Sequence, residues 1–66
     1  MRPMHANTEA LLKFFEYDHL PPHLQEISKP LHDLAHQFAA KLDGPELTVG
    51  LRKLLEAKDA FVRSAL

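Results

Sequence analysis

Two proline-containing breaks, HLPP at residues 19–22 and DGP at residues 43–45, divide this chain and limit what it can fold into. A proline forces the residue before it out of the helical region, but it fits the first turn of a helix, where its missing N–H is not needed. Gly44 tolerates left-handed backbone angles, which is typical of the point where a helix ends. Each break is therefore expected to end one helix and to begin the next.

The segments between the breaks repeat their apolar residues at helical spacing. Residues 8–16 are predicted to form a short helix, with Asn7 as its N-terminal cap and Glu9 near its positive end. Residues 22–42 are predicted to form a second helix, because their apolar positions are separated by three or four residues. These positions are Leu24, Ile27, Leu31, Leu34, Phe38 and Leu42. Residues 45–65, with a broad apolar side, are predicted to form the third helix.

Two residues interrupt these helical patterns. Pro30 lies inside the second predicted helix, where a proline removes one backbone hydrogen bond and costs about 3 kcal/mol. We expect a kink there, or a restart of the helix capped by Ser28. Gly50 costs the third predicted helix about 1 kcal/mol relative to Ala; it indicates close approach by another backbone or a ligand, or else tolerated variation.

The expected fold class is all-α, with a short N-terminal helix followed by a long antiparallel helical hairpin in one domain, residues 1–66. A chain of 66 residues buries only a thin core, and without Cys it has no disulfide to support that core. Two long helices with such wide apolar sides cannot cover each other completely. We therefore expect a homo-oligomer in which the leftover apolar surface, together with Phe14 and Phe15, is buried between chains.

Charge and composition argue against several function classes. The net charge of −1 and the pI of about 6.5 disfavour binding to long DNA or RNA, which needs a basic face. The chain has no signal-like N-terminus and no run of about 18 apolar residues, so a cytosolic location without a membrane partner is expected. With no Cys, two Ser outside any nucleophile motif and two isolated Gly, no enzymatic activity and no cofactor are expected.

The five histidines raise the question of a metal site. His32 and His36 are four residues apart on the second predicted helix, and His19 and His23 have the same spacing across the proline turn. A metal site of the usual kind needs a third protein ligand, and the HExxH pattern is absent. We expect solvated histidines on the polar side of the helix and predict no metal site.

The remaining candidates for function are aromatic and cationic residues that suit a small nucleotide. Phe15 and Tyr17 stand where the first predicted helix ends, and a ring at such a point can stack on a base. The cations suited to phosphate contacts are Lys29, Arg52, Lys53 and Lys58. The alternative for these lysines and the arginine is an ordinary solvated surface. For Lys58 the alternatives are an ion pair with Glu9, Glu56 or Asp59, or extension of its stem across the apolar stripe into solvent. In an interlocked bundle we expect it to reach a carboxylate of another chain.

Three stretches, FEYDHLPP, SKPLHDLA and GPELTVGLRKLLEAKDAFV, resemble a family of small phage proteins. These are the cyclic-oligonucleotide sponges with which phages defeat CBASS immunity and, in related members, Thoeris immunity. The resemblance covers residues 14–65. It implies helical hairpins interlocked as a hexamer in the host bacterial cytoplasm. It also implies pockets between protomers that sequester cyclic dinucleotides, and in some members cyclic trinucleotides or cyclic ADP-ribose variants, without cleaving them.

The resemblance also implies roles for individual residues. Tyr17 matches the aromatic residue that stacks on a base, Lys29 matches a phosphate-contacting lysine, and Lys53 matches a recurrent lysine of the third helix. Many relatives carry Arg after the turn glutamate, whereas Leu47 follows it here. A second, trinucleotide-type site would therefore need Arg52 as a replacement.

A second function class stays open from the residues alone. An apolar stripe of Leu51, Leu55, Val62 and Leu66 would let the chain act as an oligomeric protein–protein interaction module that takes a partner helix into a groove. A helix-turn-helix DNA binder is disfavoured, because neither long helix carries an exposed run of Arg, Asn and Gln.

Overall fold

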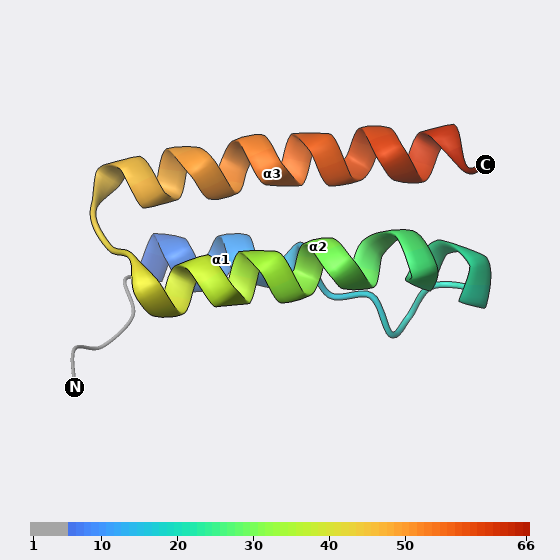
Figure 1. Ribbon diagram of the computed structural model, residues 1–66, viewed down its shortest axis with the longest axis horizontal. Helices are drawn as coiled ribbons and strands as arrows, with labels where there is room; N and C mark the ends of the chain where they lie inside the picture. The colour runs from blue at the N-terminus through green and yellow to red at the C-terminus, as the bar shows by residue number, and fades with distance from the viewer. Residues whose placement is uncertain (1–5) are drawn as a thin grey trace.

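The computed structural model describes residues 6–66 and contains three helices in that range. They are α1 (Ala6–Lys13), α2 (Pro22–Lys41) and α3 (Pro45–Ser64). The two long helices run antiparallel as a hairpin, and α1 lies beside them on one side (Figure 1). The predicted all-α fold, a short helix followed by a long hairpin, is confirmed.

The short helix α1 has different bounds from the predicted 8–16. It begins at Ala6, so that Asn7 lies inside the helix instead of capping it, and it ends at Lys13. Thr8, expected at the start, is buried with only 3% of its surface exposed.

The last turn of α1 explains its early end. The backbone N–H groups of Phe14 and Phe15 donate to the carbonyls of Leu11 and Leu12, three residues back, each at 3.0 Å. Hydrogen bonds that span three residues instead of four tighten the final turn of a helix, and the helix ends there. The tightened turn directs Phe15 into the core, where it is 0% exposed, and leaves Phe14 61% exposed.

The long helix α2 is close to its predicted bounds and begins with Pro22 in its first turn. It continues through Pro30 without a break, so the expected restart capped by Ser28 does not occur. Ser28 instead faces inward, 1% exposed, and its Oγ has no hydrogen-bond partner. The kink at Pro30 stays a prediction.

The loop between α2 and α3 follows the predicted stop. Leu42 is extended, and its N–H donates to the carbonyl of Phe38 at 2.9 Å. Gly44 has φ 94° and ψ 177°, a region that is essentially open to glycine only. Pro45 then starts α3, so that the chain reverses direction over residues 42–44.

The core lies where α1 and its final turn meet the hairpin. Its buried members are Leu12, Phe15, Ala35, Leu47 and Leu51. Of the six apolar positions predicted along α2, only Leu24 is buried; Phe38 and Leu42 are 39% and 56% exposed. The small residues Ser28 and Ala35 are buried instead, and Ala35 packs in the core with Leu12 and Phe15. No helix within residues 6–66 has the length and apolar character needed to span a bilayer.

Candidate functional site

Tyr17 lies in the connection between α1 and α2 and packs against the side of α2. Its ring meets the His32 ring edge-on, with centroids 4.9 Å apart and planes at 73°. The connection is fixed by Gln25 of α2, whose Nε2 donates to the carbonyls of Leu20 at 2.8 Å and Asp18 at 3.4 Å. These bonds, with Phe15 anchored in the core, hold Tyr17 half-buried on the surface of α2.

His36 continues the row of rings that Tyr17 and His32 begin. The centroids of His32 and His36 are 4.3 Å apart and their planes are tilted by 43°. The two histidines are one helical turn apart, so their side chains lie on the same face of α2.

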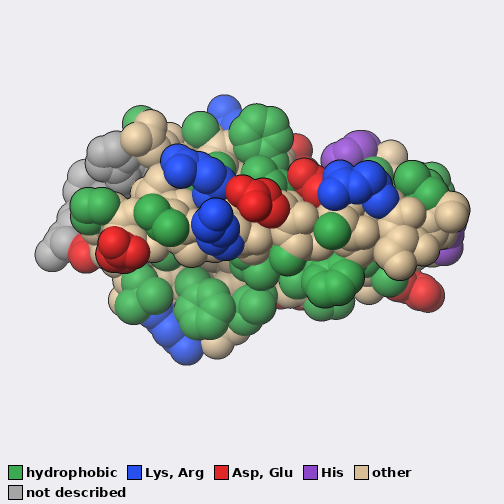
Figure 2. Space-filling model, turned by 90° about the horizontal axis from the view of Figure 1, so that it is seen from above, with side chains coloured by type: hydrophobic (Ala, Val, Ile, Leu, Met, Phe, Trp, Pro, Cys, Tyr) green, Lys and Arg blue, Asp and Glu red, His purple; other side chains and the backbone are tan. Residues whose placement is uncertain are grey.

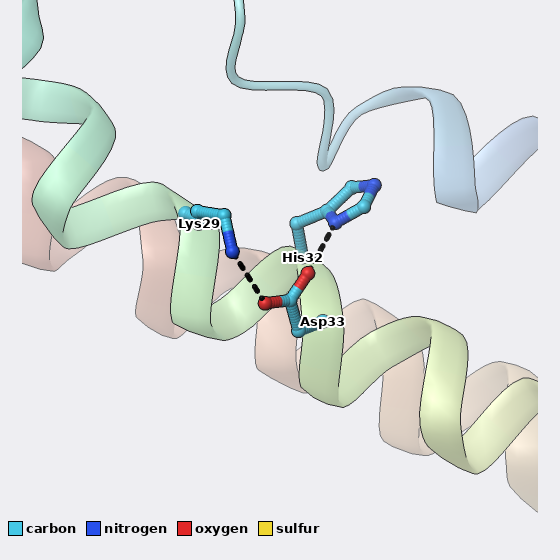
Figure 3. A network of polar contacts seen from close by, with 3 residues as sticks. All are labelled: Lys29, His32 and Asp33. Carbon is cyan, nitrogen blue, oxygen red and sulfur yellow. Dashed lines mark hydrogen bonds and ion pairs between the residues drawn. The ribbon is translucent and has the colours of Figure 1, made fainter.

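An ion-pair network borders the rings (Figure 3). Lys29 Nζ lies 3.2 Å from Asp33 Oδ2, and His32 Nδ1 lies 3.0 Å from Asp33 Oδ1. Since the carboxylate can only accept, both nitrogens donate to it. Asp33 thereby orients the His32 ring and fixes the position of the Lys29 ammonium group.

The same network shifts two pKa values. The pKa of Asp33 lies below its ordinary value, first because of the hydrogen bond from His32 and then because of the one from Lys29. The pKa of Lys29 is raised by its hydrogen bond to Asp33, by the charge of Asp33 and, to a smaller extent, by Tyr17. Both side chains are more than half exposed, so water screens this pair.

We call Tyr17, Lys29, His32, Asp33 and His36 the tyrosine–histidine cluster. It brings together two of the residues that the sequence singled out, Tyr17 and Lys29. Of its other members, His32 and His36 were expected to be solvated, and Asp33 was not singled out. On α2, His32 and Asp33 follow Lys29 by three and four residues, and His36 follows Asp33 and His32 by three and four residues. This spacing is the signal that places them on one side of the helix.

Three other predicted ligand-binding residues lie elsewhere. Phe15 is wholly inside the core, so its ring is closed to a ligand in the folded chain. Arg52 is exposed on α3 and lines a hollow of about 360 Å³ with Asn7 and Thr48, at the start of the helix. Lys53 is exposed beside it on α3.

Lys58 has a carboxylate partner within its own chain. Its Nζ lies 3.1 Å from Asp59 Oδ1, and its side chain is only 14% exposed. It lines a hollow of about 210 Å³ together with Phe14, His19 and Arg63. One of the intrachain partners expected for Lys58 is therefore the observed one.

Two apolar hollows follow each other along the α2–α3 seam. One, of about 420 Å³, lies beside the hairpin loop, and the other, of about 460 Å³, lies toward the opposite end of the hairpin. We call the Leu, Ile and Phe residues of this lining that are not buried the apolar face; they are Ile27, Leu31, Phe38, Leu42, Leu54 and Phe61. Figure 2 looks onto α3 and shows hydrophobic side chains gathered along one long edge, below a band of cationic and acidic side chains.

The apolar face differs from the stripe expected on the third helix. Leu51 is 2% exposed and belongs to the core, and Leu55 is half-buried against it. Phe61 is 55% exposed and Phe38 is 39% exposed. The exposed apolar surface is therefore shared by both long helices, because α1 covers the side of α3 that carries Leu51.

Comparison of the chain with protein-family models, with curated proteins and with solved structures gave no match. Within residues 6–66, no group of three or more side chains is arranged to hold a metal ion. The chemistry that the tyrosine–histidine cluster offers is an aromatic ring, a cation and imidazole nitrogens.

Proposed function

We propose that this chain is a phage-encoded sponge for cyclic nucleotide second messengers. It binds cyclic dinucleotides, and cyclic trinucleotides as a second ligand class, without cleaving them. By lowering the free messenger concentration in the host bacterial cytoplasm, it blocks CBASS-type signalling. The chain acts as a homo-oligomer, with the hexamer as the proposed assembly.

The observation that carries this proposal is the placement of Tyr17 beside Lys29 on an open surface of α2. Base stacking on an aromatic ring and charge-assisted hydrogen bonds to phosphate are the two contacts that a cyclic nucleotide needs. The pKa of Lys29 is raised to a smaller extent by a Coulombic interaction with Tyr17, which is consistent with the two side chains lying near each other. A base on the Tyr17 ring would therefore place its phosphate within reach of Lys29.

Self-association supplies the rest of the pocket in this proposal. Arg52 and Lys53 lie on α3, outside the tyrosine–histidine cluster, and in this proposal they complete the pocket from a neighbouring copy. The apolar face supports such an assembly, since exposed aromatic side chains are stabilised by burial between chains. Phe15 takes no part in ligand contact and acts by anchoring the segment that carries Tyr17.

Calorimetric titration with a panel of cyclic dinucleotides and trinucleotides tests the proposal. A sponge gives sub-micromolar binding, and chromatography after heating recovers the ligand unchanged. Absence of heat with every cyclic nucleotide, including cyclic ADP-ribose isomers, would reject it.

Variants at Tyr17 test the stacking role. Tyr17→Ala is expected to weaken binding by about 1–3 kcal/mol, the usual contribution of a base–aromatic stack. Tyr17→Phe keeps the ring and is the matched control, with affinity close to that of the parent chain. Equal affinity in the alanine variant would remove Tyr17 from the site.

The apolar face also favours a second candidate function, a helical protein–protein interaction module without a nucleotide ligand. Its hollow beside the hairpin loop is lined by Phe38, Leu42 and Leu54, which suits the apolar side of a partner helix. Light scattering separates the two candidates. A monomer or simple dimer that binds a hydrophobic dye favours the interaction module, and a closed oligomer that binds cyclic nucleotides favours the sponge.

A further inference from the structure

The histidine pair of the tyrosine–histidine cluster has a geometry that nucleotide stacking does not require. His32 and His36 stand one turn apart on α2 with ring centroids 4.3 Å apart. Two imidazoles on one face of a rigid helix can reach a common point above it with rotation about their side-chain bonds alone. This is the arrangement in which two nitrogen ligands chelate one metal ion.

The hydrogen bond from His32 to Asp33 prepares one of these ligands. Because Nδ1–H donates to the carboxylate at 3.0 Å, the lone pair of the neutral ring is on Nε2. Histidines that bind metals commonly donate their other ring N–H to a carboxylate, which fixes the tautomer and makes the ligating nitrogen more basic. Asp33 already occupies that position.

His36 is the open partner of the pair. It is exposed, and among residues 6–66 its side chain makes a ring contact with His32 and no hydrogen bond. Tyr17 packs against His32 in a T-shaped contact and restricts that ring, while His36 remains able to adjust. One held ligand and one adjustable ligand are available without disturbing the core.

We propose that His32 and His36 chelate one divalent transition-metal ion of the imidazole-preferring class, Zn²⁺, Ni²⁺ or Cu²⁺. Two imidazole nitrogens bind the ion, water completes its coordination, and Asp33 holds His32 through the hydrogen bond to Nδ1. Imidazole suits these three ions better than it suits Mg²⁺ or Ca²⁺, which take oxygen ligands. The inference does not depend on the sponge function, because the metal is bound in the absence of any nucleotide.

His19 and His23 provide an internal comparison. They have the same spacing in sequence, but His19 lies in a turn before α2 and His23 lies in its first turn. No helix joins them, so the spacing does not place their rings on one face. They are expected to contribute nothing to metal binding.

Calorimetric titration of the untagged full chain with Zn²⁺, and in parallel with Ni²⁺ and Cu²⁺, tests the inference. One ion per chain is expected, with affinity rising from Zn²⁺ and Ni²⁺ to Cu²⁺. Binding should disappear in His36→Ala, an exposed position whose change leaves the helices intact by circular dichroism. It should persist when His5, His19 and His23 are all replaced by Ala. Asp33→Ala should weaken binding about 10- to 100-fold, the usual effect of losing the carboxylate that hydrogen-bonds to a ligating histidine.

NMR of the histidine ring protons gives a second measurement, made directly at the proposed ligands. Cu²⁺ should broaden the NMR signals of the His32 and His36 ring protons before those of His19 and His23. Unchanged binding in His36→Ala, loss of binding in the variant lacking the other three histidines, or no saturable binding by any of the three ions would overturn the inference.

Discussion

Phe15 shows how one buried ring holds this small protein together. It is 0% exposed and belongs to the core with Leu12 and Leu51. Truncating a buried Phe to Ala usually costs about 3–5 kcal/mol, which is about the total stability that a core of this size provides. Phe15→Ala should therefore be largely unfolded at 25 °C, as followed by circular dichroism and urea titration. Phe14→Ala, at a ring that is 61% exposed, is the control and should keep the fold. Equal stability of the two variants would contradict the core role of Phe15.

Asp33 gives the surface of α2 a dependence on pH. Its folded pKa lies below the ordinary value of 3.8, so the interactions that lower it stabilise the folded chain only while the carboxylate is charged. This contribution is complete above the ordinary pKa and is lost as the pH falls through the lower folded value. Lys29 behaves in the opposite sense, since its raised pKa gives a contribution that is lost only as the pH rises through that value.

The pH dependence of Asp33 can be isolated with one variant. The free energy of unfolding of the parent chain minus that of Asp33→Asn should be positive near pH 6 and should shrink toward zero as the pH is lowered past 3.8. Urea titrations at a series of pH values measure this difference. Glu26→Asn, at an exposed position on the same helix, gives the background for removal of a surface carboxylate. A difference that does not change with pH would show that Asp33 contributes through something other than its charge.

At the scale of elements, α2 carries a defect that its packing overcomes. Pro30 lies within a helix that runs without interruption from Pro22 to Lys41, so the carbonyl of Glu26 lacks its usual N–H donor. Pro30 is exposed, and Ala has no atom that would clash there. Pro30→Ala should therefore raise the free energy of unfolding, by up to about 3 kcal/mol, in urea or thermal titrations. Pro22→Ala at the first helical position is the matched control and should change stability by less than about 0.5 kcal/mol. Loss of stability in Pro30→Ala would indicate that the proline ring makes a contact worth more than the missing hydrogen bond.

The helix boundaries show which parts of the fold can be predicted from local sequence. Pro22, Gly44 and Pro45 fix their boundaries through backbone constraints that act within a few residues, and the structure places these boundaries as expected. The end of α1 was predicted at residue 16 and lies at Lys13. The tight turn there is stabilised by the burial of Phe15 against the hairpin. A contact between distant parts of the chain has no signature in local spacing.

The same distinction applies to the candidate site. The spacing of Lys29, His32 and Asp33 on one helix is readable from the sequence, and their contacts follow from it. The contact of Tyr17 with His32 depends on the path of the connection before α2, which Gln25 fixes through bonds to backbone carbonyls. Such bonds cannot be inferred from the type of residue. Sequence alone therefore proposed Tyr17 and Lys29 separately, and the fold brings them together.

At the scale of the whole molecule, the apolar face leads to a prediction about concentration. Phe38 and Phe61 are 39% and 55% exposed on a face that both long helices share. If copies of the chain bury this face against one another, association stabilises the fold by mass action, and the thermal midpoint rises with protein concentration. Replacing both rings by Glu should abolish this rise and give a single-chain mass in sedimentation velocity, because a buried charge without a partner opposes association.

Val49→Glu is the matched control for this experiment. Val49 is also an exposed apolar residue of α3, 41% exposed, but it lines the hollow at the start of the helix with Arg52 and lies off the apolar face. The control should keep both the concentration dependence and the oligomeric mass. If the parent chain sediments as a single copy at every concentration, the apolar face does not join copies of the chain. The pocket proposed between protomers would then lack the second chain that supplies Arg52 and Lys53. If Val49→Glu dissociates the oligomer as completely as the double variant does, the contact between copies extends over α3 beyond the apolar face.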